Sequence, residues 1–242
     1  MEGLIDTESF RPRAVVFDLD GTLADNMHWH ARAFQAFVQR HSLPPITEAT
    51  RQRIDGKRNA EIMPILFERP LSTEEVTALA WEKEEMYRAL SRGGLHPIRG
   101  LSDLLDALES QGIPAAVATS APRENVVHTL GELGLADRFE AVALSDEVPR
   151  GKPFPDVYLR AAEGLGVDPS ACLAFEDAPV GVAAARAAGM RCLALTSTFS
   201  AEAFRAADSP PNDVCADYVE YLAGEGQWLT AERSAGRLSD YP

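Results

Sequence analysis

The chain has 242 residues, of which 45% are hydrophobic and 25% are charged. This length and composition are typical of a soluble globular protein with one sizeable core and room for a small inserted domain. The formal net charge of −14 argues against nucleic acid as a partner, because a phosphate backbone is bound by an excess of Lys and Arg. A small phosphorylated molecule stays compatible with this charge, since a lysine and a bound cation can reverse the potential of a single cleft.

Cysteines and termini bear on where the protein works. Cys172, Cys192 and Cys215 are odd in number and widely spaced, and no pair has the spacing of zinc ligands. We expect buried thiols in a reducing compartment. Residues 1–13 lack the basic start and apolar stretch of a signal peptide, and no apolar run reaches membrane-spanning length. The sequence therefore predicts a cytoplasmic protein with no membrane partner.

The segment Val15–Leu23 begins as an apolar run and ends in two carboxylates and a glycine turn. We predict a buried strand, and ligands in open α/β sheets bind just beyond the carboxyl ends of such strands. Strand side chains alternate between faces, so Asp18 and Asp20 would point the same way if the strand continued. Two close negative charges need a neutralising partner, and Mg²⁺ prefers carboxylate and phosphate oxygens. An ordinary strand followed by an acidic turn is the alternative interpretation.

The next segment has a helical pattern. Residues 27–41 predict a helix with Phe34 and Phe37 on its apolar stripe, and a pair of prolines then stops it. Residues 72–75, Ser-Thr-Glu-Glu, have the sequence of a capping box, which predicts a second helix to about residue 90. The segment between Asn26 and Pro97 is therefore predicted to be an all-helical insertion.

From residue 101 onward, helical and strand patterns alternate. We predict strands at 115–118, 141–144, 171–175 and 192–195, and helices at 101–110, 123–133, 154–164 and 178–189. Such alternation indicates a parallel, doubly wound sheet with right-handed crossovers. Residues 217–222 fit a last edge strand or a short helix, and the polar tail from Gly224 is weakly patterned.

Three further polar motifs complete a candidate site. Thr119 follows the second predicted strand, Lys152 stands between a glycine and a proline ahead of a helix, and Glu176 and Asp177 follow a later strand. Taken singly, the threonine could be a helix N-cap, the lysine a solvated loop residue and the acids partners of a helix dipole. Together with Asp-x-Asp, however, they form a set suited to phosphoryl transfer, which depends mainly on positioning and electrostatics.

The motifs and their order resemble the haloacid dehalogenase-like hydrolases over nearly the whole chain. Within that superfamily, Phe-Asp-Leu-Asp-Gly-Thr-Leu at 17–23 and Gly-Lys-Pro-Phe-Pro-Asp at 151–156 are similar to the β-phosphoglucomutase-like phosphatases. The resemblance implies a Rossmann-like α/β catalytic core of residues 1–26 and 97–242. It also implies a C1-type helical cap, residues 27–96, that opens and closes over the site.

The resemblance implies a chemical role for the core motifs. Asp18 would attack phosphorus and form an aspartyl phosphate, and Asp20 would protonate the leaving oxygen and then deprotonate water. Thr119 would hydrogen-bond the transferring phosphoryl group, while Lys152 would offset its charge.

Mg²⁺ is the implied cofactor. It would lie between the Asp18 carboxylate, the backbone carbonyl of Asp20 and Asp177, with Glu176 close by or linked through water. The implied reaction is hydrolysis of a small phosphorylated metabolite, with a sugar phosphate favoured, by a monomer or weak oligomer.

Residues near the cap are candidates for substrate contact. The candidates are His30, Lys57, Arg58, Asn59, Lys83 and Ser120. His30 and Lys83 fall where the family pattern has a cap histidine and a cap lysine, and the loop around Lys57 resembles the cap specificity loop. The alternatives are a packing role for His30, a solvated i,i+4 charge pattern for Lys83 and a surface turn for the loop. His28 is expected to be exposed.

Several other activities share parts of this pattern. Sugar-phosphate mutases of the family carry an arginine that grips a second phosphate where Asn59 falls here, so a phosphatase is favoured over β-phosphoglucomutase. Inorganic pyrophosphatase is a further alternative. A signalling receiver domain also combines an acidic Mg²⁺ cluster with Thr and Lys, but it is about half this size and has no helical insertion. Dehalogenation does not need the acidic metal cluster that Asp20 and Asp177 preserve.

Overall fold

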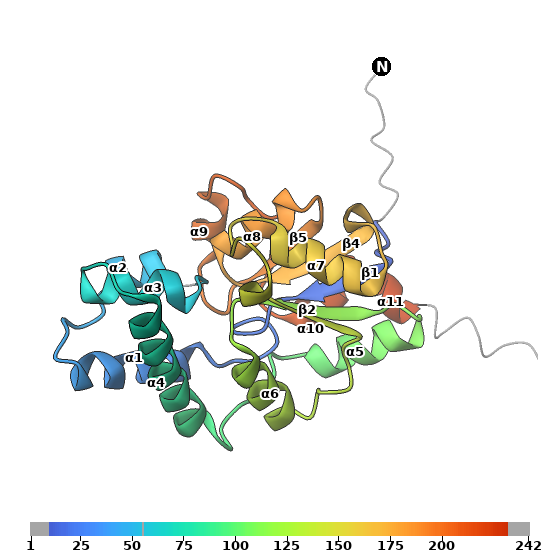
Figure 1. Cartoon of the computed structure of the whole chain (residues 1–242). Helices are drawn as coiled ribbons and strands as arrows, with labels where there is room; N and C mark the ends of the chain where they lie inside the picture. Colours follow the sequence, from blue (N-terminus) through green and yellow to red (C-terminus); the bar gives the residue numbers. More distant parts are fainter. Residues whose placement is uncertain (1–9, 55, 232–242) are drawn as a thin grey trace, which may run out of the picture.

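The computed structural model of the chain describes residues 10–54 and 56–231. Within them, a parallel six-stranded sheet has the order β3-β2-β1-β4-β5-β6 (Figure 1). The strands are β1 (Ala14–Phe17), β2 (Ala115–Thr119), β3 (Ala141–Leu144), β4 (Cys172–Glu176), β5 (Arg191–Leu195) and β6 (Asp213–Cys215). Strand order reverses at β1, with β2 on one side and β4 on the other. The predicted doubly wound sheet is confirmed, and the carboxyl end of β1 lies at its switch point.

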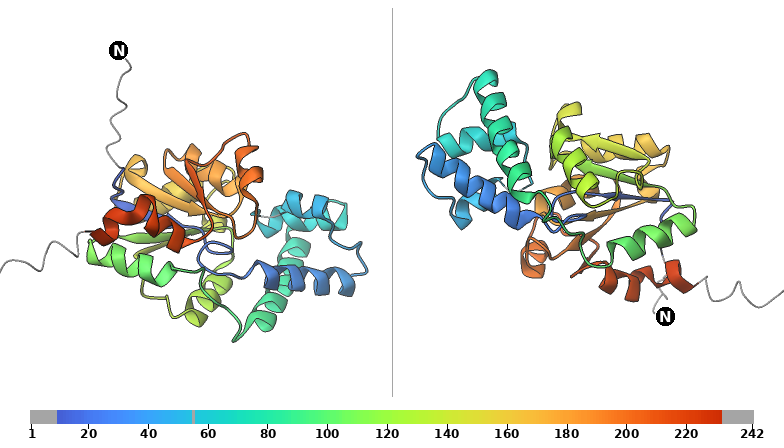
Figure 2. Two further views of the ribbon diagram at one scale, coloured as in Figure 1. Left: turned by 180° about the vertical axis from the view of Figure 1, so that it is seen from behind. Right: turned by 90° about the horizontal axis from the view of Figure 1, so that it is seen from below.

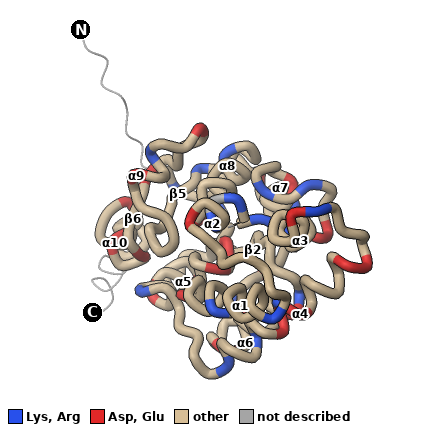
Figure 3. Tube along the Cα trace, turned by 90° about the vertical axis from the view of Figure 1, so that its left-hand side faces the viewer, with Lys and Arg blue, Asp and Glu red and all other residues tan. Residues whose placement is uncertain are grey.

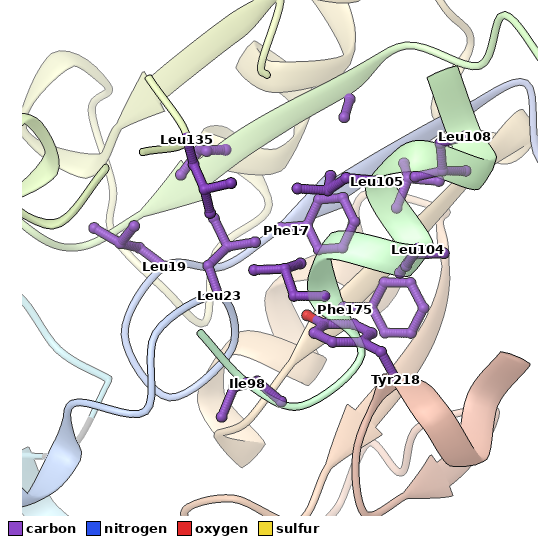
Figure 4. Close-up of a cluster of buried hydrophobic side chains, with 14 of the residues drawn as sticks. Phe17, Leu19, Leu23, Ile98, Leu104, Leu105, Leu108, Leu135, Phe175 and Tyr218 are labelled. Carbon is purple, nitrogen blue, oxygen red and sulfur yellow. The ribbon is translucent and has the colours of Figure 1, made fainter. Parts of the chain in front are cut away.

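Alternate residues of each strand enter two different hydrophobic clusters. Val15 and Phe17 pack with α5 (Leu101–Ser110), α6 (Arg123–Glu132), α10 (Tyr218–Ala223) and α11 (Trp228–Ala231) on one face. Ala14 and Val16 pack with α7 (Asp156–Leu165), α8 (Pro179–Ala187) and α9 (Ala201–Arg205) on the other. Figure 4 shows the first cluster, in which the rings of Phe17 and Phe175 stack with centroids 5.4 Å apart. This period-2 burial fixes the strand register, and with it the position of the residues at the strand ends.

Of the two alternatives for residues 217–222, the short helix is the one observed. Helix α10 spans Tyr218–Ala223 with Asp217 at its N-cap, and the edge strand β6 comes just before it. The weakly patterned tail begins with short helices, of which Trp228 and Leu229 pack against the first cluster. Three single-turn 3₁₀ segments complete the secondary structure of the described residues: Ser145–Glu147, Pro169–Ala171 and Glu225–Gln227. Most of segment 1–13, and the tail beyond residue 231, lie outside the described residues.

Helices α1 (Met27–Arg40), α2 (Glu48–Ile54), α3 (Asn59–Phe67) and α4 (Thr73–Ser91) form a lobe beside the sheet (Figures 1 and 2). The lobe has its own apolar cluster, whose fully buried members include Phe37, Ile54 and Met63. The predicted capping box is present, since Ser72 Oγ accepts from the Glu75 backbone N–H and the Glu75 carboxylate accepts from that of Ser72. Seen from the lobe side, cationic and anionic segments are interspersed over these helices (Figure 3).

Two linkers join this lobe to the sheet, and they run side by side. Asp25 N–H donates to the His96 carbonyl at 2.9 Å, and Ala24 forms an isolated bridge with Pro97. The division between a cap of residues 27–96 and a core formed by the rest stays a prediction. Among the described residues, no helix combines the length and apolarity needed to cross a bilayer.

Candidate active site

The core motifs meet at the carboxyl ends of three neighbouring strands. Asp18 follows β1, Thr119 ends β2, and Glu176 and Asp177 stand at the end of β4. Lys152 Nζ reaches them from the loop before α7 and lies 2.5 Å from Asp18 Oδ1 and 2.6 Å from Glu176 Oε1. All five side chains are buried, and they line one cavity of about 630 Å³ that also contacts the cap helices.

A tight turn after β1 brings the first motif against Asp177. Gly21 adopts φ +76°, a left-handed conformation that L side chains rarely adopt. A Cβ at Gly21 would overlap the Asp177 carboxylate, so glycine is required both by the turn and by this close approach. Thr22 Oγ1 lies 3.5 Å from Asp177 Oδ1, on the same side of the turn.

Glu176 is held by four protein donors. Its Oε1 accepts from Lys152 Nζ and from Tyr158 Oη at 2.7 Å, and its Oε2 accepts from the backbone N–H groups of Asp177 and Ala178 at 3.0 and 3.2 Å. Gly181 on α8 leaves the space that this carboxylate fills. With both oxygens engaged, Glu176 is suited to fixing Lys152 and the β4–α8 turn, which leaves Asp177 the better candidate for direct metal coordination.

Three carboxylates and one ammonium share this buried pocket. Oxygens of Asp18, Glu176 and Asp177 all lie within 4.8 Å of one another. Burial raises the pKa of Asp18 to about 7 even though Lys152 opposes the shift. Burial, together with the charges of Glu176 and Asp18, also raises the pKa of Asp177 well above its usual range. The excess of negative charge and the all-oxygen donor set fit a divalent cation such as Mg²⁺.

The Thr119 hydroxyl keeps its proton available. Its Oγ1 accepts a hydrogen bond from the backbone N–H of Ala121 at 3.0 Å, which orients the hydroxyl at the end of β2. Helix α6 has Pro122 at its N-cap, so the interpretation of Thr119 as the cap of this helix is wrong. A hydroxyl that accepts from the backbone can still donate to an anionic oxygen in the cavity.

Asp20 contacts Asn26, the N-cap of α1, and His30 on α1 itself. Its Oδ1 accepts from Asn26 Nδ2 at 2.6 Å and lies 3.4 Å from His30 Nε2. Burial alone would raise the pKa of Asp20, but the charge of His30 and hydrogen bonds from His30 and Asn26 outweigh it and lower that pKa. The His30 ring stacks on Tyr87 with centroids 3.8 Å apart, so His30 is both packed and next to the second motif carboxylate.

A buried polar network extends from His30 across the cap to α6. Lys83 Nζ lies 3.2 Å from His30 Nδ1 and 2.9 Å from Glu84 Oε1, and Lys83 lines the cavity. Glu84 also accepts from Asn59 Nδ2 at 2.9 Å and from Asn125 Nδ2 at 2.6 Å. Lys83 is buried, so its interpretation as part of a solvated charge pattern is wrong.

The predicted specificity loop bridges the cap to two core loops. Arg58 Nη1 donates to the Ser145 carbonyl at 3.2 Å, and Ser120 Oγ donates to the Gly56 carbonyl at 3.0 Å. Lys57 lines the cavity, whereas Arg58 does not. The basic pair is thus divided, with Arg58 directed at the core. His28 is exposed, as expected.

Sequence reasoning missed three residues that organise the site. Asn26 holds Asp20, Glu84 collects the cap network, and Tyr158 holds Glu176. Glu84 was missed because it lies among other acidic residues of a helix whose charge pattern predicts exposure to solvent. Only the position of Asn26, immediately after the first motif and before α1, gave a usable signal.

This chain is similar in sequence to several known proteins. The model of the haloacid dehalogenase-like hydrolase family matches residues 12–189. Protein CbbY from Rhodobacter capsulatus is 36% identical over 207 residues, which cover 81% of this chain and 91% of that protein. The fructose-1-phosphate phosphatase YqaB from Escherichia coli is 33% identical, with 74% of this chain and 94% of that protein covered.

A solved structure gives the same result for the fold. The crystal structure of a HAD hydrolase of family IA, variant 3, from Entamoeba histolytica superposes with a TM-score of 0.79 at 27% identity, covering 90% of this chain and 99% of that one. The chain belongs to the haloacid dehalogenase-like hydrolases.

Proposed function

We propose that this enzyme is a Mg²⁺-dependent phosphatase that hydrolyses a small phosphorylated metabolite of the sugar-phosphate class through an aspartyl phosphate. The observation that carries the proposal is the pairing of Asp18 with Lys152 at the switch point, beside Asp177. The substrate class rests on relatives such as the fructose-1-phosphate phosphatase of E. coli.

In the first half-reaction, an Asp18 carboxylate oxygen attacks phosphorus while the bond from phosphorus to the leaving oxygen breaks. The leaving oxygen takes the proton of the Asp20 carboxyl group. The Thr119 hydroxyl donates a hydrogen bond to a phosphoryl oxygen, and the Lys152 ammonium offsets the charge gathered around Asp18.

In the second half-reaction, a water molecule gives a proton to Asp20 and its oxygen attacks phosphorus. The bond between phosphorus and Asp18 breaks, which releases phosphate and restores the Asp18 carboxylate and the protonated Asp20 carboxyl group. Because the pKa of Asp20 is lowered in this structure, its acid role in the first half-reaction requires a substrate-bound, closed state in which that pKa is higher. Asn26 and the cap residue His30 orient the Asp20 carboxylate.

Mg²⁺ would be held by the carboxylates of Asp18 and Asp177 and by the backbone carbonyl of Asp20. Glu176 would position Lys152 and the backbone of Asp177 through its hydrogen bonds. When bound, the metal would neutralise the carboxylates and the phosphoryl oxygens so that an anionic nucleophile can approach an anionic substrate. Without it, the burial and mutual repulsion of Asp18 and Asp177 work against their both being ionised.

Hydrolysis is favoured over phosphoryl return to a sugar bisphosphate. Mutases of the family hold the second phosphate with an arginine, but Asn59 stands at that position here and is bound to Glu84, and the neighbouring Arg58 is bound to the Ser145 carbonyl. Lys57 is the cation of this loop that lines the cavity, and the primer assay below tests whether it replaces the arginine. We also propose a cytoplasmic location and a monomer or weak oligomer; the three cysteines are buried and free, as in a reducing compartment.

The test measures phosphate release from sugar phosphates, pyrophosphate and β-glucose 1-phosphate with a glucose 1,6-bisphosphate primer. We expect release from sugar phosphates with Mg²⁺, loss of it with EDTA, and recovery when Mg²⁺ is restored. Metal-independent turnover would reject the metal site, and conversion of β-glucose 1-phosphate to glucose 6-phosphate without phosphate release would identify a mutase instead.

A further inference from the structure

Helix α1 has a second apolar stripe in addition to the one that packs inside the cap. Ala33 and Phe37 are fully buried, and α1 packs mainly against α4. The second stripe lines the active-site cavity and consists of Met27, Ala31, Phe34 and Val38. At about 100° per residue these four positions share one side of the helix. Val38 also belongs to the buried cap cluster and Phe34 packs against it, so this stripe contributes to the cap core and lines the cavity at the same time.

The loop after α1 continues this surface. Leu43 and Ile46 line the same cavity and are only half-buried, although both pack on the edge of the cap cluster. We call the six side chains the apolar wall: Met27, Ala31, Phe34, Val38, Leu43 and Ile46. Apolar area left facing a cavity is costly in water, and it indicates a binding surface when it is contiguous.

The cavity reaches from the catalytic carboxylates to the apolar wall. Its volume of about 630 Å³ falls in the range of about 300–1,000 Å³ for sites that hold drug-sized ligands. Asp18, Thr119 and Lys152 lie at the catalytic end, which takes the phosphoryl group. The remaining volume is therefore available to the leaving group, because the leaving group is the part of the substrate attached beyond phosphorus.

The polar side chains around Glu84 are already engaged with one another, whereas Gln35, Gln39 and Lys57 also line the cavity. Glu84 accepts from Lys83, Asn59 and Asn125, and the Lys83 ammonium also lies 4.2 Å from the centre of the Phe34 ring. These groups have less capacity to bind hydroxyls of a ligand than their number indicates. Apolar contact with the wall would therefore contribute to recognition beyond the first carbons of the leaving group.

We propose that the alcohol released by this enzyme carries an apolar body, beyond the carbon that bears the phosphate, which packs against the apolar wall. The proposal rests on the proposed phosphatase function and specifies the part of the substrate that lies beyond the phosphate-bearing end: the released alcohol is amphiphilic.

The test uses the full chain with Mg²⁺ and a series of ethyl, butyl and hexyl phosphate. Their leaving alcohols have similar acidity, so differences in kcat/KM report contact rather than leaving-group chemistry. Burial of a methylene group is worth about 0.8 kcal/mol, so we expect kcat/KM to rise about fourfold per methylene. Binding of hexyl phosphate to the Asp18→Asn variant should show a more negative heat-capacity change than binding of ethyl phosphate.

A matched pair of variants locates the effect on the wall. Ala31→Leu places a larger side chain in front of the apolar wall, so kcat/KM should rise less from ethyl to hexyl phosphate than it does in the wild type. Ala36→Leu makes the same change on the opposite side of α1, outside the cavity lining, and should leave rates and slope as in the wild type. Comparable melting temperatures of the two variants would show that both fold.

The two proposals fail differently. The proposal of an apolar body would be wrong if all three esters had the same kcat/KM, or if hexyl phosphate were hydrolysed more slowly than ethyl phosphate. Either result would leave the proposed phosphatase function unaffected. The proposal would also be wrong if Ala31→Leu and Ala36→Leu reduced the rise of kcat/KM with chain length to the same extent. If no phosphate monoester is hydrolysed with Mg²⁺, including the sugar phosphates, the proposed phosphatase function itself is wrong.

Discussion

The core half and the cap half of this site are built in different ways. In the core, Asp18, Thr119 and Glu176 stand at the ends of paired strands, so sheet register alone brings them together. In the cap, His30 and Lys83 stand on helix faces and meet only because α1 packs against α4. The core half is thus fixed by topology, whereas the cap half depends on a polar network that crosses to α6 through Asn125.

The largest effect is expected where the core half is anchored. Glu176→Gln keeps the shape of the side chain but replaces one acceptor oxygen by a donor, which must then face either Lys152 and Tyr158 or two backbone N–H groups. Breaking such a buried pair costs about 3–5 kcal/mol. We expect a loss of this size in chemical denaturation and at least about a hundredfold loss of kcat, consistent with misplacing a catalytic group.

Glu163→Gln is the control for this change. Glu163 makes an exposed ion pair with Arg160 on α7, so its replacement should leave both stability and kcat unchanged. Equal stability of the Glu176 and Glu163 variants would mean that Glu176 does not anchor the core half.

A smaller effect is expected in the cap network. Glu84→Gln removes the buried charge that faces Lys83 and weakens the bonds from Asn59 and Asn125. We expect a loss of about 2–3 kcal/mol, since hydrogen bonds to charged groups contribute about 1.5–3 kcal/mol, and a fall in kcat/KM of about tenfold. Glu85→Gln, one residue along on the exposed side of α4, is the matched control. A Glu84 variant as active and as stable as the Glu85 variant would contradict a functional cap network.

The ion pair between Glu84 and Lys83 predicts a pH dependence of stability. Burial by itself would raise the pKa of the Glu84 carboxyl group, but Lys83 and the hydrogen bonds to Glu84 outweigh burial and lower that pKa below its usual 4.5. A group with a lowered folded-state pKa contributes stability above its unfolded-state pKa and loses it as pH falls. The gap in melting temperature between wild type and Glu84→Gln should therefore be constant from pH 7 to about 5 and shrink below pH 4.5. A melting-temperature difference that increases as the pH falls would mean that the pKa of Glu84 is raised rather than lowered.

The smallest effect is expected at the bridge between cap and core. Arg58→Met removes the bond to the Ser145 carbonyl, so KM should rise only a few-fold. Because Arg58 faces the core, the rise should be the same for fructose 1-phosphate and fructose 1,6-bisphosphate. A larger rise in KM for the bisphosphate than for the monophosphate would instead mean that Arg58 binds a second phosphate.

How far the sequence predicts the site follows the same division. Asp18, Thr119, Lys152 and Asp177 could be predicted to converge because each follows a strand or precedes a helix of an alternating α/β pattern. The split between Lys57 and Arg58 could not, since it depends on which core loop lies opposite. Strand β6 was missed because an edge strand of three residues leaves too short a pattern to detect.

Acid-quenched mass spectrometry of the enzyme during turnover tests the catalytic assignment most directly. Wild-type enzyme mixed with Mg²⁺ and a hydrolysable sugar phosphate should carry one phosphoryl group on the peptide containing Asp18, with a larger fraction in Asp20→Ala, where release slows. Asp18→Asn should carry none and release no phosphate. Phosphate release by Asp18→Asn, or a phosphoryl group found on another residue, would contradict the nucleophilic role of Asp18.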